Sequence, residues 1–253
     1  MKKTLKFLII IILISPKTFA IGTYKKGDVL YNWKNPGINL RIKPNEKSEI
    51  ITILPFGERL FVVEENLKKN KFSIQEIAPV VKYDSINEGF NFRGFQIKGF
   101  WVKVKTNSGE TGYVFDGYLS KLKPDFELNE TYFDAKFKLT KSSSKKFPKS
   151  ISDNAYSKTS FYKNGSYIIQ NRSDYVGHEH FFIPNISLEE GYLLVLKSRP
   201  YVLQLHKSSG DNQTNYQYDA KELSFTTSLE AISITKITYK SIKGIEIVFE
   251  GWD

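Results

Sequence analysis

Apolar and polar residues alternate along most of the chain beyond the first twenty residues. The clearest example is the segment INLRI, in which every second residue is apolar: Ile38, Leu40 and Ile42. In an extended strand these side chains share one face, and Asn39 and Arg41 point to the other. No later segment sustains the apolar period of about 3.6 residues that marks an amphipathic helix. The pattern therefore predicts an all-β fold.

The first part of the chain, residues 21–124, divides into short strands separated by turn-forming residues. Gly57 and Gly109 stand where two of these turns are expected, and Pro44 starts a polar loop. Further strands are expected at 50–54, 60–63, 101–105 and 112–114. Short strands joined in this way are typical of a small barrel.

A long insertion at about 64–99 interrupts this series of strands. It is much longer than a usual hairpin connection. It also contains too many apolar residues for a flexible loop, including Phe72, Ile74 and Phe95, and alternation resumes at Phe90. We therefore expect an extended hairpin that lengthens the strands of the barrel.

The second part, residues 125–253, is also expected to be all-β, and its motifs identify no family. Turn residues separate the apolar segments, which favours an antiparallel β-sandwich or a barrel-like region. The segment at about 140–160 is rich in Ser and Lys and is predicted to be a linker or a long loop. Strands are expected at 131–139, 166–170, 179–183, 192–197, 201–206, 229–239 and 242–250.

Residues 1–20 have the pattern of a secretory signal peptide. Lysines at the start precede the apolar run Phe7–Ile14, which is too short to span a bilayer comfortably. Thr18 and Ala20 supply the small residues of a cleavage site, and a retained anchor is the alternative. We expect export to the periplasm, the cell surface or the medium, with no integral membrane segment after signal cleavage.

The composition narrows the possible partners. The chain has 253 residues and no cysteine, so disulfides cannot stabilise it. Its formal net charge is +10, and four lysines of the signal account for part of it, which leaves +6 for the remainder. A basic exported protein attracts anionic envelope polymers or lipid headgroups, and nucleic acid is not an expected partner. Lysine-rich sequence is also typical of plain solvated surface, so the charge does not identify the partner.

Two separated blocks carry a family resemblance. GINLRIKPNEKSEIITILPFGERLFVV resembles the opening half of bacterial SH3-type domains, with an alternating strand, a proline loop and a Pro-x-Gly turn. GFWVKVKTNSGETGYVFDGYLSK resembles the closing half, with its WVKV and GYV strands. Together they cover about a fifth of the chain. The resemblance implies an SH3-like barrel over residues 21–124 with a binding groove beside its loops, and the long insertion departs from the family pattern.

Catalytic groups are sparse. The chain has no cysteine for a thiolate nucleophile and no G-x-S-x-G elbow for a serine hydrolase. His178 and His180 share one face of a predicted strand, and with His206 they are the only material for a metal site. Without an HExxH-type motif, a solvent-facing pair at a strand entrance is the favoured interpretation. Adjacent Glu189 and Glu190 are interpreted as a charged turn, since neighbouring strand residues point apart. We expect no enzyme, metal or cofactor.

A candidate ligand-binding surface lies on the outward face of the predicted barrel. Trp101 and Lys103 lie opposite the core face, and Tyr113 and Arg41 belong to neighbouring strands. Aromatic walls with a few hydrogen-bond donors suit peptides or glycans. The alternative is that Trp101 and Tyr113 pack under the inserted hairpin, while Tyr118 closes the barrel.

The leading functional hypothesis is an exported, non-catalytic binding module that recognises a cell-wall peptide or glycan, or an envelope protein. A second hypothesis is a structural or interaction protein whose binding face lies in residues 125–253. A third is a metal-dependent hydrolase built on the three histidines.

Overall fold

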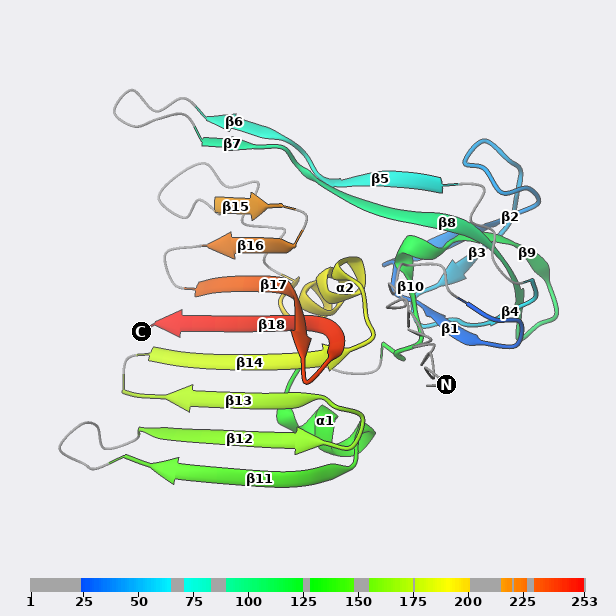
Figure 1. Ribbon diagram of the computed structural model, residues 1–253. Coiled ribbons are helices and arrows are strands. Elements are labelled where there is room, and N and C mark those ends of the chain that lie inside the picture. Colours follow the sequence, from blue (N-terminus) through cyan, green and yellow to red (C-terminus); the bar gives the residue numbers. More distant parts are fainter. Residues whose placement is uncertain are drawn as a thin grey trace, which may run out of the picture.

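The computed structural model shows a chain built mainly of β-strands (Figure 1). They form two large antiparallel sheets, and the described residues add only two short α-helices. This confirms the all-β prediction. The signal predicted at 1–20 and the strand predicted at 201–206 lie outside the described residues. The structure describes residues 24–64, 71–82, 90–124, 128–147, 155–174, 176–200, 215–219, 221–226 and 230–252.

The N-terminal sheet is strongly curved (Figure 1) and has the strand order β10-β1-β4-β8-β9-β2-β3, with β5 added on β8. The turn of 3₁₀ helix η1 (Asp116–Tyr118) connects β9 to β10. The strands are β1 (Val29–Asn32), β2 (Gly37–Arg41), β3 (Ile50–Pro55), β4 (Arg59–Val62), β5 (Lys71–Ile77), β8 (Phe95–Thr106), β9 (Thr111–Phe115) and β10 (Leu119–Ser120).

The two sequence blocks that resemble one family lie in this same sheet. Strand β9 pairs with β8 on one side and with β2 on the other, where Arg41 lies opposite Tyr113. Leu40 of β2 and Val104 of β8 are both fully buried in one hydrophobic cluster. The alternation of the sequence therefore places these two side chains in a shared core.

The insertion forms an arm that leaves the N-terminal sheet. Strand β5 pairs antiparallel with the first half of β8, and β6 (Val80–Lys82) pairs with β7 (Phe90–Phe92) farther out. Strand β8 has 12 residues and runs from the arm into the curved sheet without interruption. This is the extended hairpin expected from the sequence pattern.

The C-terminal sheet is open, with the order β11-β12-β13-β14-β18-β17-β16-β15. Helices α1 (Glu130–Lys136) and α2 (Leu188–Ser198) contact one of its faces (Figure 1) and take the place of the second sheet that a sandwich needs. The strands are β11 (Leu139–Lys146), β12 (Tyr156–Tyr162), β13 (Tyr167–Arg172), β14 (Val176–Pro184), β15 (Asn215–Tyr218), β16 (Glu222–Thr226), β17 (Glu230–Tyr239) and β18 (Ile242–Trp252).

Three sequence predictions in this half need correction. The region 140–160 is not simply a linker, because β11 and β12 occupy its described ends and pair with each other. All eight residues of β11 are exposed, as suits an edge strand rich in Ser and Lys. The segments 131–139 and 192–197 were predicted as strands, but 131–136 and 192–197 are helical.

Polar caps explain why these aromatic and aliphatic segments are helical. The Asn129 side chain accepts a hydrogen bond from the Tyr132 amide at the start of α1. At the start of α2, the Ser187 hydroxyl accepts from the Glu190 amide, while the Glu190 carboxylate accepts from the Ser187 amide. This reciprocal pair of hydrogen bonds is a capping box. It was not identified from the sequence, because the segment that follows it was interpreted as a strand. Glu189 and Glu190 thus lie in the first helical turn and not in a charged turn before the strand.

Removal of the α2 cap gives a first prediction. Ser187→Ala is expected to lower the free energy of unfolding by about 1 kcal/mol, because the Glu190 backbone N–H loses the side-chain oxygen that accepts its hydrogen bond. Urea denaturation followed by circular dichroism measures the change. Ser144→Ala on the exposed strand β11 is the matched control and should leave stability unchanged. Equal stability of the two variants would contradict the role of the cap.

The arm and helix α2 join the two sheets through one continuous hydrophobic cluster. The Phe95 ring centroid lies 4.9 Å from that of Tyr192 in α2 and 5.2 Å from that of Tyr218 in β15. The Ser120 hydroxyl donates to the Glu190 carboxylate at 2.6 Å across the same junction. The inserted arm is therefore a structural joint between the two halves.

Candidate functional site

A groove of about 410 Å³ opens on the N-terminal sheet between β2, β5 and β8. Its polar lining consists of Lys34, Asn39, Arg41 and Glu46. Its apolar and aromatic lining consists of Ile38, Phe72, Ile74, Trp101, Phe115 and Tyr118. Two of the four ligand-binding residues predicted from the sequence, Arg41 and Trp101, thus lie on one concave surface.

An aromatic cluster forms one wall of the groove. The Trp101 ring centroid lies 5.6 Å from Phe72 and 6.3 Å from Phe115, and those two rings meet edge to face at 5.3 Å. Trp101 is only 5% exposed. Trp101 thus packs against Phe72 of the inserted strand β5 and also lines the groove, and its predicted role in ligand binding stays a prediction. The insertion builds a wall of the groove and leaves it open.

Arg41 brings a permanent cation to the groove. The Arg41 Nη1 donates to the Ser48 carbonyl oxygen at 2.5 Å, which ties the side chain to the loop between β2 and β3. A guanidinium has five N–H donors, and this bond uses one of them. A half-buried guanidinium held in this way is suited to bind a carboxylate or a carbonyl oxygen.

A second set of polar side chains, Lys34, Glu76 and Tyr118, lies beside η1. The Lys34 Nζ is 3.1 Å from Glu76 Oε1 and 4.3 Å from the Tyr118 ring centroid. The Tyr118 hydroxyl donates to the same carboxylate. Burial and the Glu76 carboxylate raise the pKa of Tyr118, so the hydroxyl keeps its proton. Tyr118 is 4% exposed, in keeping with its predicted place in the core.

Lys103 and Tyr113 do not line the groove, which corrects the predicted site. The strand register places Lys103 opposite Tyr113 and Trp101 opposite Phe115, so all four share the outer face of the sheet. The Lys103 Nζ forms a 2.6 Å salt bridge with Glu64 and lies 5.8 Å from the Tyr113 ring centroid. Of these four residues, Trp101 and Phe115 line the groove.

Exposed isoleucines extend this surface beyond the groove, and sequence reasoning missed them. Ile53 of β3 is 64% exposed and lies directly opposite Asn39, which lines the groove. Ile50 and Ile51 of the same strand are 45% and 40% exposed. In the described sheet, β3 is the terminal strand, so its outer edge has no neighbouring strand. The available sequence signal was the presence of three isoleucines within four residues, Ile50, Ile51 and Ile53.

The two described histidines each lie near a different carboxylate. His178 and His180 lie on one face of β14, as predicted; on β18, Glu250 lies directly opposite His178, and Glu246 lies diagonally across from His180. His178 Nδ1 is 3.3 Å from Glu250, and His180 Nδ1 is 3.6 Å from Glu246. The described residues contain no group of three or more His, Cys, Asp or Glu side chains placed to hold a metal ion. His206 lies outside the described residues.

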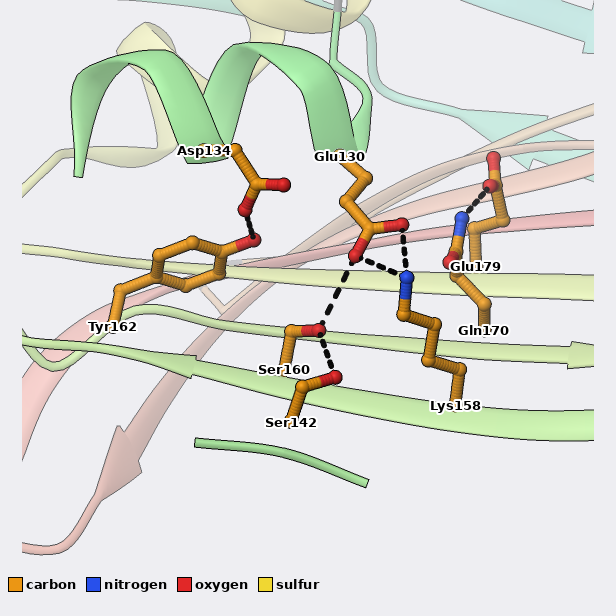
Figure 2. A network of polar contacts seen from close by, with 8 residues as sticks. All are labelled: Glu130, Asp134, Ser142, Lys158, Ser160, Tyr162, Gln170 and Glu179. Carbon is orange, nitrogen blue, oxygen red and sulfur yellow. Dashed lines mark hydrogen bonds and ion pairs between the residues drawn. The ribbon is translucent and has the colours of Figure 1, made fainter. Parts of the chain in front are cut away.

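A network of polar contacts connects α1 with the C-terminal sheet (Figure 2). Glu130 of α1 forms a 2.6 Å salt bridge with Lys158 and accepts a hydrogen bond from Ser160, which is 2% exposed. Nearby, the Tyr162 hydroxyl donates to Asp134 at 2.9 Å. Both carboxylates come from the helix and both sets of partners come from β12, so the network fastens α1 to the sheet.

Two acids with raised pKa values lie at the junction between the sheets. Asp116 Oδ1 accepts from the Phe100 amide at 2.6 Å, whereas its Oδ2 has no hydrogen-bond partner among the described residues. Burial raises the pKa of Asp116 to about 8, and the nearby Glu190 and Glu189 carboxylates act in the same direction. Desolvation also raises the pKa of Glu190. Asp116 is buried and Glu190 is half-buried, and neither residue lines the groove.

Comparison with known proteins identifies no relative. No protein-family model, curated protein or solved structure matches the chain. In the described part of the chain, neither helix has the length and apolar character needed to cross a bilayer. The function is therefore argued from the residues and their geometry.

Proposed function

We propose that the protein is an exported, non-catalytic binding module that recognises a cell-wall peptide or glycan, or an envelope protein, through the groove of its N-terminal sheet. The observation that carries this proposal is the groove itself, in which the Trp101 and Phe72 rings lie beside Arg41 and Lys34. Rings bind apolar faces of a ligand at little cost in side-chain entropy, and the cations hold its carboxylates or carbonyl oxygens.

The shape of the surface favours a chain-like ligand over a compact one. A volume of about 410 Å³ lies within the range of small-ligand sites. The exposed Ile53 and the open edge of β3 continue the surface past the groove. A peptide that extends from the groove along this strand buries these isoleucines and satisfies the edge N–H and C=O groups.

The SH3-type assignment of the N-terminal sheet is part of the proposal. Two facts support it: both resembling blocks pair within one curved sheet, and Leu40 and Val104 share one core. Export is supported by the signal-like pattern of residues 1–20. The absence of a cysteine and of a G-x-S-x-G motif in the sequence supports a non-catalytic role.

A second candidate places the binding face on the C-terminal sheet. Phe181 of β14 and Ile245 of β18 point to the face that contacts the helices, so His178 and His180 belong to the opposite face. That opposite face carries half-buried polar side chains on several strands. It favours a structural or interaction protein whose partner lies flat on this sheet.

Binding to purified cell-wall sacculi tests the proposal. We expect the protein to sediment with sacculi at low salt, and Arg41→Gln to weaken binding about tenfold through loss of a charge-assisted contact. Arg59→Gln is the matched control, because Arg59 is exposed and lies outside the groove. Trp101→Ala is unsuitable, since removal of a buried ring also destabilises the fold.

Two outcomes would count against the groove as a wall-binding site. One is a wild-type protein that stays in the supernatant at low salt. The other is an equal loss of sedimentation for Arg41→Gln and Arg59→Gln, because this result indicates only nonspecific attraction between a basic protein and an anionic polymer.

A further inference from the structure

A second and larger cavity, of about 570 Å³, lies where strand β8 passes the hairpin of β17 and β18 near the start of α2. It is separate from the groove, since the two share no lining residue. Its lining includes five lysines that come from separate segments of the chain: Lys71, Lys98, Lys221, Lys236 and Lys243. All five side chains are exposed to solvent.

The charged side chains that line this cavity are mostly positive. Among the described residues that line the cavity, Glu189 is the only carboxylate beside the five lysines, so these ionised side chains carry a net charge of +4. Lys98 and Lys236 act on Glu189 by lowering its pKa, against the larger raising effect of burial. In the described part of the chain, Lys71 and Lys243 take part in no salt bridge. Like charges gathered from five segments repel one another until an anion offsets them.

Part of the cavity lining is apolar. It includes Phe100, Ile186, Ile237 and Ile245. Lysines that are simply solvated do not require a cavity with apolar side chains in its lining. The combination of five lysines with an apolar lining therefore distinguishes this site from ordinary charged surface. A matching ligand carries anionic groups at one side and an apolar or sugar portion at the other.

We propose that this cavity binds a ligand with at least two phosphate groups attached to an apolar or sugar portion. Lysine ammonium groups bind phosphate as point charges, and five of them exceed what a single phosphate contacts. The same chemistry is found in soluble organic phosphates, in phosphodiester polymers and in anionic lipid headgroups. The site is independent of the groove and adds a second ligand to the proposed binding module.

Isothermal titration with inorganic pyrophosphate at low salt tests the site, with inorganic phosphate as the weaker reference. We expect saturable pyrophosphate binding that Lys98→Gln/Lys243→Gln weakens at least about tenfold, since two charge-assisted contacts are lost. Lys105→Gln/Lys163→Gln removes the same charge from exposed lysines outside the cavity and should leave binding unchanged. Absence of saturable binding, or equal weakening in both double variants, would overturn the proposal.

Vesicles separate the sources of the phosphate. Vesicles that contain cardiolipin, a lipid with two phosphates, separate the lipid source: capture of the protein, with release when pyrophosphate is added, assigns the cavity to lipid headgroups. If cardiolipin vesicles fail to capture a protein that binds pyrophosphate, the ligand is a soluble or polymer-borne phosphate. Phosphatidylcholine vesicles, which carry no net charge, serve as the control in both arms.

Discussion

Phe95→Ala is expected to lower the free energy of unfolding by about 3–5 kcal/mol. The Phe95 side chain is fully buried, and its ring contacts Tyr192 of α2 and Tyr218 of β15. Alanine leaves a cavity at the place where the inserted arm meets the C-terminal half. Because both sheets share one hydrophobic cluster, the loss should reach strands of both.

Hydrogen exchange read by mass spectrometry measures this effect in each half separately. We expect peptides from β4 and from α2 to lose protection together in Phe95→Ala. Phe61→Ala is the control, because its half-buried ring lies in β4 away from the junction, and it should cost less than half as much. A loss of protection confined to the arm, with stability close to that of the wild type, would show that Phe95 does not couple the two sheets.

Asp116 is expected to make stability depend on pH. Burial raises its pKa from 3.8 to about 8, so the folded protein keeps a proton that the unfolded chain releases. The free energy of unfolding therefore falls as the pH rises from about 4 to about 8, by up to about 1.4 kcal/mol per pH unit. Above the folded pKa this dependence ends. Glu190 contributes in the same direction because burial raises its pKa as well.

Asp116→Asn isolates this effect. The amide oxygen still accepts from the Phe100 N–H group, but the side chain no longer titrates. The stability of the variant relative to the wild type should therefore increase steadily between pH 5 and pH 8, as measured by urea denaturation at each pH. Glu49→Gln removes an exposed carboxylate and serves as the control. A difference between Asp116→Asn and the wild type that stays constant over this range would refute the assignment.

Strand pairing was predictable where one face of the strand is buried and the other is not. In β2, the alternation of Ile38 and Leu40 with polar neighbours matches the observed burial. Helix α2 was missed because residues 192–196 form a continuous apolar and aromatic run, so the period alone does not distinguish a strand from a helix. The deciding information was the capping box of Ser187 and Glu190. Strand β11 was missed because both of its faces are polar and exposed.

The candidate site was predictable only in part, and for a related reason. Arg41 and Trp101 were found because strand parity places them on the outer face of the sheet. The same alternation also led to the choice of Lys103 and Tyr113. Alternation indicates which face of the sheet a residue occupies, but it does not indicate where a groove forms on that face. Phe72 and Lys34 enter the groove through tertiary packing of the arm and of the loop after β1. Their sequence positions carry no signal for that contact.

Strand β8 connects the junction between the sheets with both proposed binding sites. Along β8, Phe95 lies at the junction, Lys98 at the lysine-lined cavity and Trp101 at the groove. The insertion therefore positions the junction and contributes to both proposed sites. Its first strand, β5, contributes Phe72 to the groove and Lys71 to the cavity.

Chemical-shift mapping of the labelled protein with soluble cell-wall fragments tests the central claim most directly. The claim predicts saturable shifts in β2, in the Phe72 region of β5 and at the indole N–H of Trp101, and predicts that Arg41→Gln reduces them. Shifts confined to the open face of the C-terminal sheet, around His178 and His180, would contradict it and would place the binding surface in the other half of the molecule.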